Sequence, residues 1–224
     1  DFATDSEWTD KRLKKYCDTH HIPLIEDAAQ SQGAVYGKVP SGAMGDISVF
    51  SFDPMKNMPS FGGGGMVLTD NKEVYDSVVS LRRHGLSGKD RYGYNSLISE
   101  DHANQLLLLL DKFDRLQKMR DKVCNRYRKN MPEVQILCAS PNTKSSNHKL
   151  VILSDRRDEL KKYLYTKGIQ TKIHYTKTLD SQNTGQYPQA ENICAKALSL
   201  PIYPHLKMSE VDYICDRIKE FIYV

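Results

Sequence analysis

The sequence predicts an α/β fold in which a mostly parallel sheet with flanking helices is followed by a small α+β domain. Over residues 1–100, short apolar stretches typical of strands alternate with helical patterns, an order typical of parallel sheets. A long helical pattern then covers residues 101–130, and strand and helix patterns start again over residues 131–224. We therefore expect a large-domain portion, a linking helix and a small C-terminal domain with those boundaries.

The first part opens with a helix and two strands. The helix passes through Cys17 and leads to a short buried strand at residues 23–25, after which the chain reaches Asp27. A glycine-rich stretch follows. Residues 47–52 then alternate in polarity like a second strand, which breaks at Pro54.

A third strand and a second helix complete the first part. The run Gly62–Gly65 precedes an apolar strand at residues 66–69. Asp70 and Asn71 then turn the chain into a helix, whose apolar positions are Val74, Val78, Val79 and Leu81.

The second part begins after helix 101–130, in which apolar residues recur every three or four positions. Residues 150–153 predict a strand, residues 158–166 a helix that stops at Gly168, and residues 169–174 an extended segment. The last helix starts at a pattern, Ser209 to Asp212, that resembles a capping box. Its apolar face comprises Val211, Ile214, Cys215, Ile218, Phe221 and Ile222.

Composition excludes several functional classes. A net charge of +4 is spread over 32 basic and 28 acidic residues without a block of one sign, so nucleic acid is not favoured as a partner. The five cysteines form no C-x-x-C pair and are odd in number, which argues against a disulfide framework and a zinc knuckle. No apolar run approaches the roughly 20 residues that span a bilayer. We expect a cytoplasmic protein without a membrane partner.

Four residues form the pattern that carries chemistry: Asp27, Gln30, Ser51 and Lys56. Ligands bind beyond the carboxyl ends of parallel strands, which is where Asp27 and Lys56 are expected. Pyridoxal phosphate (PLP) chemistry needs an amine, an acid for the pyridine nitrogen, and donors for the phenolic oxygen and the phosphate, and these residue types supply them. Each residue taken alone is more typical of a turn, a cap or a solvated charge.

The combination of motifs resembles the DegT/StrS-type sugar aminotransferases, which are PLP enzymes of fold type I. The resemblance runs over nearly the whole chain and keeps the order of the motifs. The stretches that carry it are 25–30 (IEDAAQ), 50–57 (FSFDPMKN), 62–65 (GGGG), 81–85 (LRRHG), 93–96 (GYNS) and 198–204 (LSLPIYP), together with Gly168-Ile169 and His174-Tyr175.

This resemblance implies a role for each matched residue. Lys56 would be the Schiff-base lysine and proton carrier, and Asp27 would hold the pyridine nitrogen. Gln30 would bind the phenolic oxygen and Ser51 the phosphate. Asn95 matches a residue that reaches the phosphate of the neighbouring subunit, while His174 and Tyr175 match a segment near the sugar nucleotide.

The resemblance also implies an activity. We expect an aminotransferase that moves an amino group from an amino acid, glutamate in our hypothesis, to a nucleotide-linked keto-sugar, in a homodimer with a shared active site. A metal is not expected, since His84 and His102 lack metal-ligand spacing. A dehydratase of the same family is disfavoured because such enzymes carry a histidine in place of Lys56.

Several alternatives stay open. Family members carry a substantial region before the Asp27 motif, including a phosphate-binding helix N-terminus, and we expect that an upstream region is missing here. The chain could therefore be a non-catalytic fragment or a regulatory subunit. By sequence alone, Gly62–Gly65 is favoured to be a flexible turn. Asn95 could be a turn residue whose only role is left-handed geometry.

Overall fold

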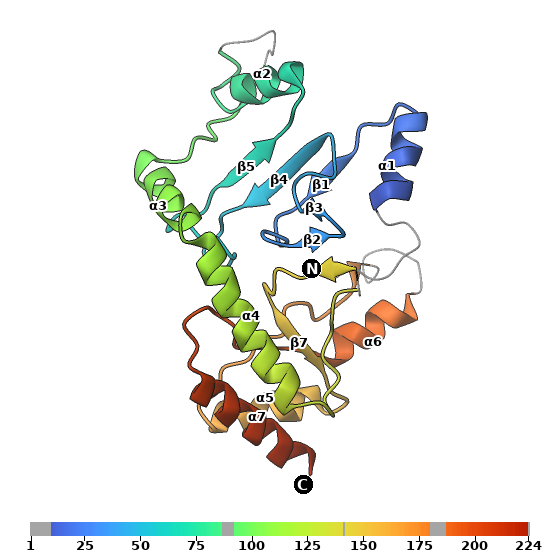
Figure 1. The fold of residues 1–224 in the computed structure, drawn as a ribbon, viewed down its shortest axis with the longest axis vertical. Coiled ribbons are helices and arrows are strands. Elements are labelled where there is room, and N and C mark those ends of the chain that lie inside the picture. The colour runs from blue at the N-terminus through green and yellow to red at the C-terminus, as the bar shows by residue number, and fades with distance from the viewer. Residues whose placement is uncertain (1–9, 87–91, 141, 180–186, 224) are drawn as a thin grey trace. The chain divides into compact units, whose positions relative to one another are not determined.

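The structure is a computed structural model that describes residues 10–86, 92–140, 142–179 and 187–223. The chain divides into two compact units (Figure 1). The first runs to Asp114 and includes Ala139–His148, and the second comprises Arg115–Cys138 and the chain from Lys149 onward. Helices and strands occur in both units, so the predicted α/β class is confirmed.

The main sheet of the first unit has the strand order β1-β4-β5. Strand β1 (Ile25–Asp27) is parallel to β4 (Ile47–Ser51), and β5 (Gly65–Leu68) is antiparallel to β4. The expectation of parallel pairing thus holds for β1 and β4 but is wrong for β5. A parallel neighbour needs a crossover, usually a helix, whereas residues 52–64, all of them described, form turns that send the chain back along β4.

The outer strands of this sheet are more exposed than their apolar sequences predict. The expectation of a buried first strand is wrong, since Ile25 in β1 is 63% exposed. All residues of β5 are exposed as well. Both strands lie at the edges of the described sheet, where a strand has a neighbour on one side only. Strand β4, in the middle, is the only one of the three with a fully buried residue, Ser48.

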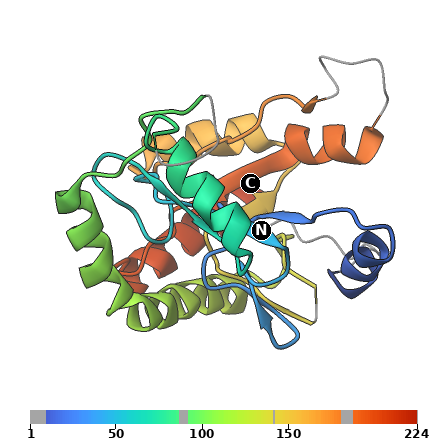
Figure 2. The ribbon, with the colours of Figure 1, turned by 90° about the horizontal axis from the view of Figure 1, so that it is seen from above.

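A second, smaller sheet in the first unit was not predicted. Strands β2 (Val35–Tyr36) and β3 (Val39–Pro40) form a hairpin, which is seen from above in Figure 2. Strand β6 (Thr143–Lys144) pairs with β2 on its other side. This pairing shows why residues 139–148 belong to the first unit, although the chain on either side of them belongs to the second.

The helices of the first unit are α1 (Asp10–Thr19), α2 (Lys72–Leu81) and α3 (Glu100–Leu110). The expected turn into α2 is confirmed, because the Asn71 side chain accepts hydrogen bonds from the first amides of the helix. The expected single helix over residues 101–130 is instead two helices, α3 and α4 (Phe113–Asn130). The break is a tightened turn in which the Lys112 amide donates to the Leu109 carbonyl, and an apolar pattern does not reveal such a short turn.

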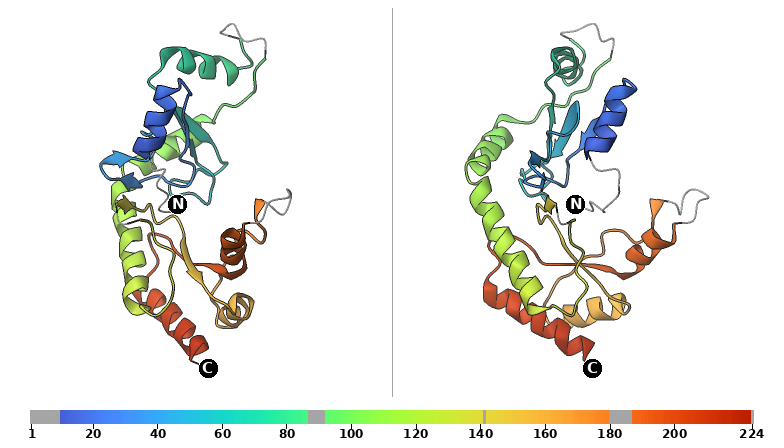
Figure 3. Two further views of the ribbon diagram at one scale, coloured as in Figure 1. Left: turned by 90° about the vertical axis from the view of Figure 1, so that its right-hand side faces the viewer. Right: turned by 45° about the vertical axis from the view of Figure 1, so that its right-hand side comes forward.

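The second unit is built around the antiparallel pair β7 (Leu150–Leu153) and β8 (Ala197–Leu200), together with α4, α5 (Arg157–Thr166), α6 (Pro188–Lys196) and α7 (Met208–Ile222). Helices α5 and α7 lie side by side next to the strand pair (Figure 3). The core of this unit comprises large apolar side chains, among them Val123, Tyr127, Leu150, Ile152, Leu160, Leu164, Leu198, Val211, Ile214 and Ile218.

The last helix confirms most of the predicted apolar face but not the predicted cap, because Val211, Ile214, Cys215 and Ile218 are buried whereas Ile222 is 46% exposed. Helix α7 begins at Met208, and its N-cap is Lys207. The Lys207 amide donates to the Glu210 carboxylate over 2.9 Å. This capping hydrogen bond starts at Lys207, two residues before Ser209. Ser209 therefore lies inside the helix and is not its cap.

No helix in the described part of the chain is long and apolar enough to cross a membrane. The five cysteines, which all lie in described segments, are free thiols. Three of them are buried: Cys17, Cys124 and Cys215.

Candidate functional site

The parallel pairing of β1 and β4 brings two predicted site residues to one edge of the sheet. Asp27, the last residue of β1, lies opposite Val49, and Ser51 ends β4 two residues later. The Ala28 amide extends the pairing by donating to the Val49 carbonyl over 2.9 Å. Since parallel strands place their carboxyl ends at the same edge, the two chain segments that follow, with Gln30 and Lys56, begin there together.

The Asp27 carboxylate forms a hydrogen bond within its own loop. One of its oxygens accepts the Ala29 amide over 3.0 Å, which fixes the side chain at the strand end. The residue is exposed, and its second oxygen is available to accept a further N–H.

The neighbouring Glu26 has a different task, which the sequence did not indicate. Its carboxylate accepts the amides of Gly42 at 2.7 Å and Met44 at 2.9 Å, and also the hydroxyls of Ser41 and Ser48. Successive strand residues point to opposite faces. Glu26 therefore anchors the turn at residues 41–44 on one face of β1, and Asp27 is directed to the other.

Lys56 lies in the turn that follows β4. Its amide donates to the Asp53 carbonyl over 2.9 Å, and the Met55 amide donates to the Asp53 carboxylate over the same distance. The residue is half-buried. Within the part of the chain that the structure describes, the Lys56 amine has no hydrogen-bond or ion-pair partner. An unpaired amine in a well-anchored turn is suited to bind a group that the chain itself does not supply.

Ser51 adds a hydroxyl at the start of the same turn. Its oxygen accepts the Asp53 amide over 3.3 Å, so the hydroxyl hydrogen remains able to donate. The residue is half-buried, as expected for a donor at the rim of a binding site.

Gln32 spans the turn that carries Lys56, a role that no sequence motif indicates. Its amide nitrogen donates to the Ser51 carbonyl over 2.9 Å, and its amide oxygen accepts the Met58 amide over 3.1 Å. Gln32 is only 6% exposed. One side chain thus joins both ends of the segment 51–58.

Asn57 is the second buried amide beside Lys56. Its nitrogen donates to the carbonyls of Ser146, at 2.9 Å, and Gln32, at 3.4 Å. Its oxygen lies 3.3 Å from Nδ1 of His148. All four side chains are buried. We call Gln32, Asn57, Ser146 and His148 the polar clamp.

In the sequence, Gln30 lies between Asp27 and Gln32 of the polar clamp. The hydroxyl of Ser146 donates to the Gln30 carbonyl over 3.3 Å, which fixes the backbone there. Gln30 is half-buried, and the role of its side chain toward the phenolic oxygen stays a prediction.

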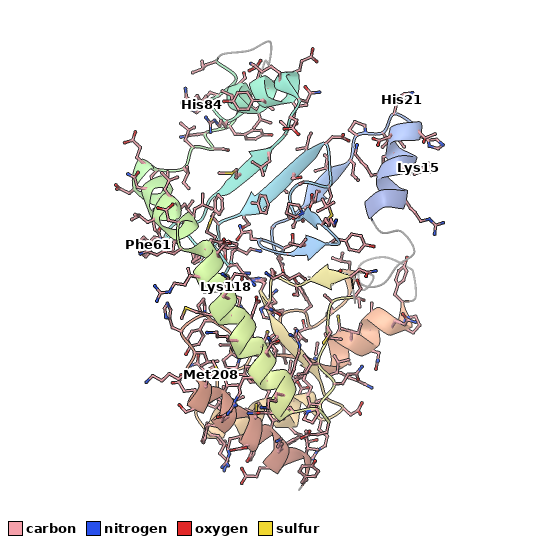
Figure 4. All side chains as sticks on the ribbon, viewed as in Figure 1. Lys15, His21, Phe61, His84, Lys118 and Met208 are labelled. Atoms are coloured by element: carbon pink, nitrogen blue, oxygen red, sulfur yellow. The ribbon has the colours of Figure 1, made fainter. Side chains whose placement is uncertain are left out.

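Asn95 is held in a segment that pairs with the end of α2. It lies opposite Arg83 in an isolated antiparallel bridge, and its side chain is exposed. The alternative of a left-handed turn residue is wrong for Asn95: the left-handed residue here is His84, which Figure 4 labels just beyond α2. The two paired segments approach so closely that a Cβ at Gly93 would collide with the backbone of His84 and Gly85.

The glycine run after Lys56 is an anchored turn. Gly63 and Gly64 have φ values of 82° and 140°, a region that favours glycine, and a Cβ at Gly62 would collide with the ring of His102. The Phe61 amide, beside α3 in Figure 4, donates to the Gln105 side chain over 3.1 Å. These contacts favour a fixed conformation over a merely flexible one.

His174 and Tyr175 belong to the second unit. In the expected extended segment 169–174, Lys172 forms an isolated antiparallel bridge with Ser199, and Nδ1 of His174 lies 2.9 Å from the Ser199 hydroxyl. Burial, with smaller contributions from Lys149 and Lys172, lowers the pKa of His174 to about 4, so the ring is neutral near pH 7.

Tyr175 offers an aromatic surface beside a cation. Its ring is more than half exposed, and Nζ of Lys149 lies 5.6 Å from the ring centroid. A neutral imidazole, a ring and a nearby ammonium group suit an anionic, aromatic ligand such as a nucleotide.

The residues of the first unit fit PLP by their chemistry. An unpaired amine, a carboxylate with an available oxygen and a hydroxyl with an available hydrogen follow the ends of two adjacent strands. These match the aldehyde, the pyridine nitrogen and the phosphate. Among the described residues, no group of three His, Cys, Asp or Glu side chains gathers to hold a metal ion.

The comparison with known sequences identifies the family. Residues 10–219 match the profile of the DegT/DnrJ/EryC1/StrS aminotransferase family. The chain belongs to this family. The resemblance inferred from the motifs is thereby confirmed.

Two relatives in this family illustrate its range. The pleiotropic regulatory protein of Geobacillus stearothermophilus is 34% identical over 218 residues, which cover 90% of this chain and 59% of that protein. The dTDP-3-amino-3,4,6-trideoxy-α-D-glucose transaminase of Streptomyces venezuelae is 31% identical over 223 residues, which cover 93% and 59%.

Solved structures of the family have the same fold. The crystal structure of DesV from S. venezuelae, in complex with a ketimine intermediate, matches with a TM-score of 0.89 and 29% identity over 98% of this chain and 62% of that one. A family aminotransferase from Brucella abortus matches with a TM-score of 0.88 and 30% identity over the same shares. The chain spans 59–60% of the length of the two relatives described above and of a third, the EryC1 protein of Saccharopolyspora erythraea.

Proposed function

We propose that the protein acts as a PLP-dependent aminotransferase that transfers an amino group from an amino acid to a nucleotide-linked keto-sugar. Membership of the family supports this, as do relatives named as transaminases of dTDP- and UDP-linked sugars. The observation that carries the proposal is the half-buried amine of Lys56, which has no partner among the described residues and lies in the turn after β4, next to the strand that ends on Asp27. We propose glutamate as the amino donor.

Each site residue has a proposed role. PLP, when bound, draws electrons away from the carbon that carries the amino group. Asp27 would keep the pyridine nitrogen protonated, Gln30 would bind the phenolic oxygen, and Ser51 would donate to the phosphate. The Lys56 amine would bind the aldehyde carbon and later carry a proton to and from the substrate carbon. Among the described residues the Lys56 amine has no hydrogen-bond or ion-pair partner, which leaves it able to do both.

The second unit would supply substrate contacts. A neutral His174 can donate or accept through Nε2 while Nδ1 is engaged with Ser199. Tyr175 and Lys149 would receive the nucleotide and its phosphates.

The remaining parts of the proposal concern assembly and location. We propose a cytoplasmic homodimer with a shared active site, in which Asn95 reaches the phosphate in the neighbouring subunit. The exposed position of the Asn95 side chain is compatible with such a contact. The division into residues 1–100, 101–130 and 131–224 also remains a proposal.

A second candidate function is regulation without catalysis. It is favoured by one observation, the name of the Geobacillus stearothermophilus relative, a pleiotropic regulatory protein. A regulatory protein could bind PLP yet transfer no amino group, so turnover separates the two candidates.

The test is a half-reaction in which the PLP-loaded protein is mixed with glutamate and the release of 2-oxoglutarate is measured. The unaltered chain should release about one equivalent per bound PLP, whereas Lys56→Ala should release none because it lacks the amine that moves the proton. Lys38→Ala serves as the control, since Lys38 is an exposed lysine in the turn between β2 and β3. Release by Lys56→Ala at the rate of the control would contradict the proposal, and PLP binding without any release would favour regulation.

A further inference from the structure

We propose that Gln32 and Asn57 are positioning residues, which hold the backbone of Lys56 at a fixed place relative to Ser51 through the polar clamp. The consequence for the cofactor rests on the proposed function. The clamp itself is defined by hydrogen bonds among residues of the first unit and does not depend on that function.

The Gln32 amide closes the segment that carries Lys56. It donates to the carbonyl of Ser51, where the segment leaves β4, and accepts the amide of Met58, where the segment ends. Because the side chain is buried, an opened segment would leave both amide groups without a partner, which is unfavourable for buried polar groups. One side chain therefore fixes the separation of Ser51 and Met58, the two residues that flank the turn carrying Lys56.

The Asn57 amide fixes the peptide unit directly after Lys56. Its two hydrogen-bond acceptors, Ser146 and Gln32, present carbonyl oxygens, so its nitrogen must face them. Its oxygen then faces Nδ1 of His148, which requires that His148 carries a hydrogen on Nδ1. The orientation of Asn57 and the tautomer of His148 determine each other.

The clamp restrains the backbone of Lys56, whose amine has no partner in the part of the chain that the structure describes. On the amino side the Lys56 amide donates to Asp53, and on the carboxyl side Asn57 and Met58 are held. Only the side chain of Lys56 remains to be ordered when it binds a ligand. Preorganisation of this kind strengthens binding because less conformational freedom is lost at that step.

The geometric part is tested by hydrogen exchange without cofactor. Gln32→Met removes both hydrogen bonds and keeps the length of the side chain. Gln117→Met is the matched control, because Gln117 is also 6% exposed but donates within α4, to Asp121. Peptides covering residues 53–60 should exchange about 5- to 30-fold faster in Gln32→Met than in the unaltered chain, as expected for the loss of one or two kcal/mol. Gln117→Met should leave them unchanged.

The functional part is tested by titration with PLP, followed through the absorbance of the lysine-bound cofactor. The concentration for half-saturation should rise about 10-fold in Gln32→Met and stay unchanged in Gln117→Met. Unchanged exchange and unchanged half-saturation in a folded Gln32→Met would overturn the inference. If the unaltered chain binds no PLP, the proposed function fails, while the exchange experiment still decides whether the clamp exists.

A conservative pair separates positioning from folding. His148→Asn keeps a donor at the atom corresponding to Nδ1, whereas His148→Leu removes it and leaves the Asn57 oxygen unpaired. The PLP concentration for half-saturation should be close to that of the unaltered chain in His148→Asn and higher in His148→Leu. Equal behaviour of the two variants would contradict the assigned hydrogen on Nδ1.

Discussion

The two units of the chain have interiors of different kinds. The core of the second unit comprises large apolar side chains contributed by α4, α5, α7, β7 and β8. In the first unit the buried side chains are mostly small or polar, among them Ala28, Gln32, Ser48, Asn57, Ser60, Ser80, Ser146 and His148. Apolar burial provides stability with little directional preference, whereas hydrogen-bonded polar groups fix a particular geometry.

The surfaces also differ, because the exposed large apolar residues of the second unit are mostly tyrosines, among them Tyr165, Tyr187 and Tyr223, whereas those of the first unit are mainly aliphatic on β5 and α3. Large apolar side chains of the first unit are exposed on β5, on α3 and in the turn between β4 and β5: Phe61, Met66, Val67, Leu68, Leu107 and Leu108. The comparison indicates that the second unit owes its stability to its own core. In the first unit the buried polar side chains mainly fix the geometry of the backbone. Its exposed apolar side chains contribute little to its stability.

The largest expected effect is a core truncation in the second unit. Leu164→Ala removes a side chain of α5 that is 0% exposed and should lower the free energy of unfolding by about 2–5 kcal/mol. Leu108→Ala makes the same change at a site on α3 that is 64% exposed, and it should cost less than about 0.5 kcal/mol. Urea unfolding measures both, and a comparable loss in Leu108→Ala would show that another surface covers α3 in solution.

A smaller effect is expected where two segments of the first unit touch. Gly93→Ala places a Cβ against the backbone of His84 and Gly85, so the segment that carries Asn95 must shift at a cost of about 1–3 kcal/mol. Hydrogen exchange of peptides covering residues 92–98 should accelerate, and peptides of α5 should be unaffected. Unchanged exchange at residues 92–98 would show that the bridge to Arg83 is absent in solution.

The smallest expected effect is a pH dependence in the second unit. Burial, helped by Lys149 and Lys172, lowers the pKa of His174 to about 4, below its ordinary value near 6.5. The unfolded chain therefore binds a proton first, and stability falls as the pH drops from about 6.5 to about 4. His174→Asn should flatten this part of the curve, and an NMR titration of the imidazole should show a midpoint well below 6. A midpoint near 6.5 would contradict the lowered pKa of His174.

The sequence predicted those features that depend on neighbours along the chain. The strand 150–153 and the apolar face of α7 follow from local periodicity, and the order Asp27, Gln30, Ser51, Lys56 is a local motif. The polar clamp could not be predicted, because Asn57 meets Ser146 and His148 across 89 and 91 residues of sequence. The antiparallel direction of β5 was missed for a similar reason, since the apolar pattern of a strand does not record its direction.

The central claim is that one particular lysine receives PLP, and mapping of the covalent adduct tests it most directly. The protein is incubated with PLP at a low molar ratio, reduced with borohydride and digested, and the peptides are weighed. We predict that the added pyridoxyl mass lies on Lys56 and that this labelling is lost in Lys56→Ala without appearing elsewhere. Labelling spread over exposed lysines such as Lys38, with Lys56 no more modified than they are, would contradict the account.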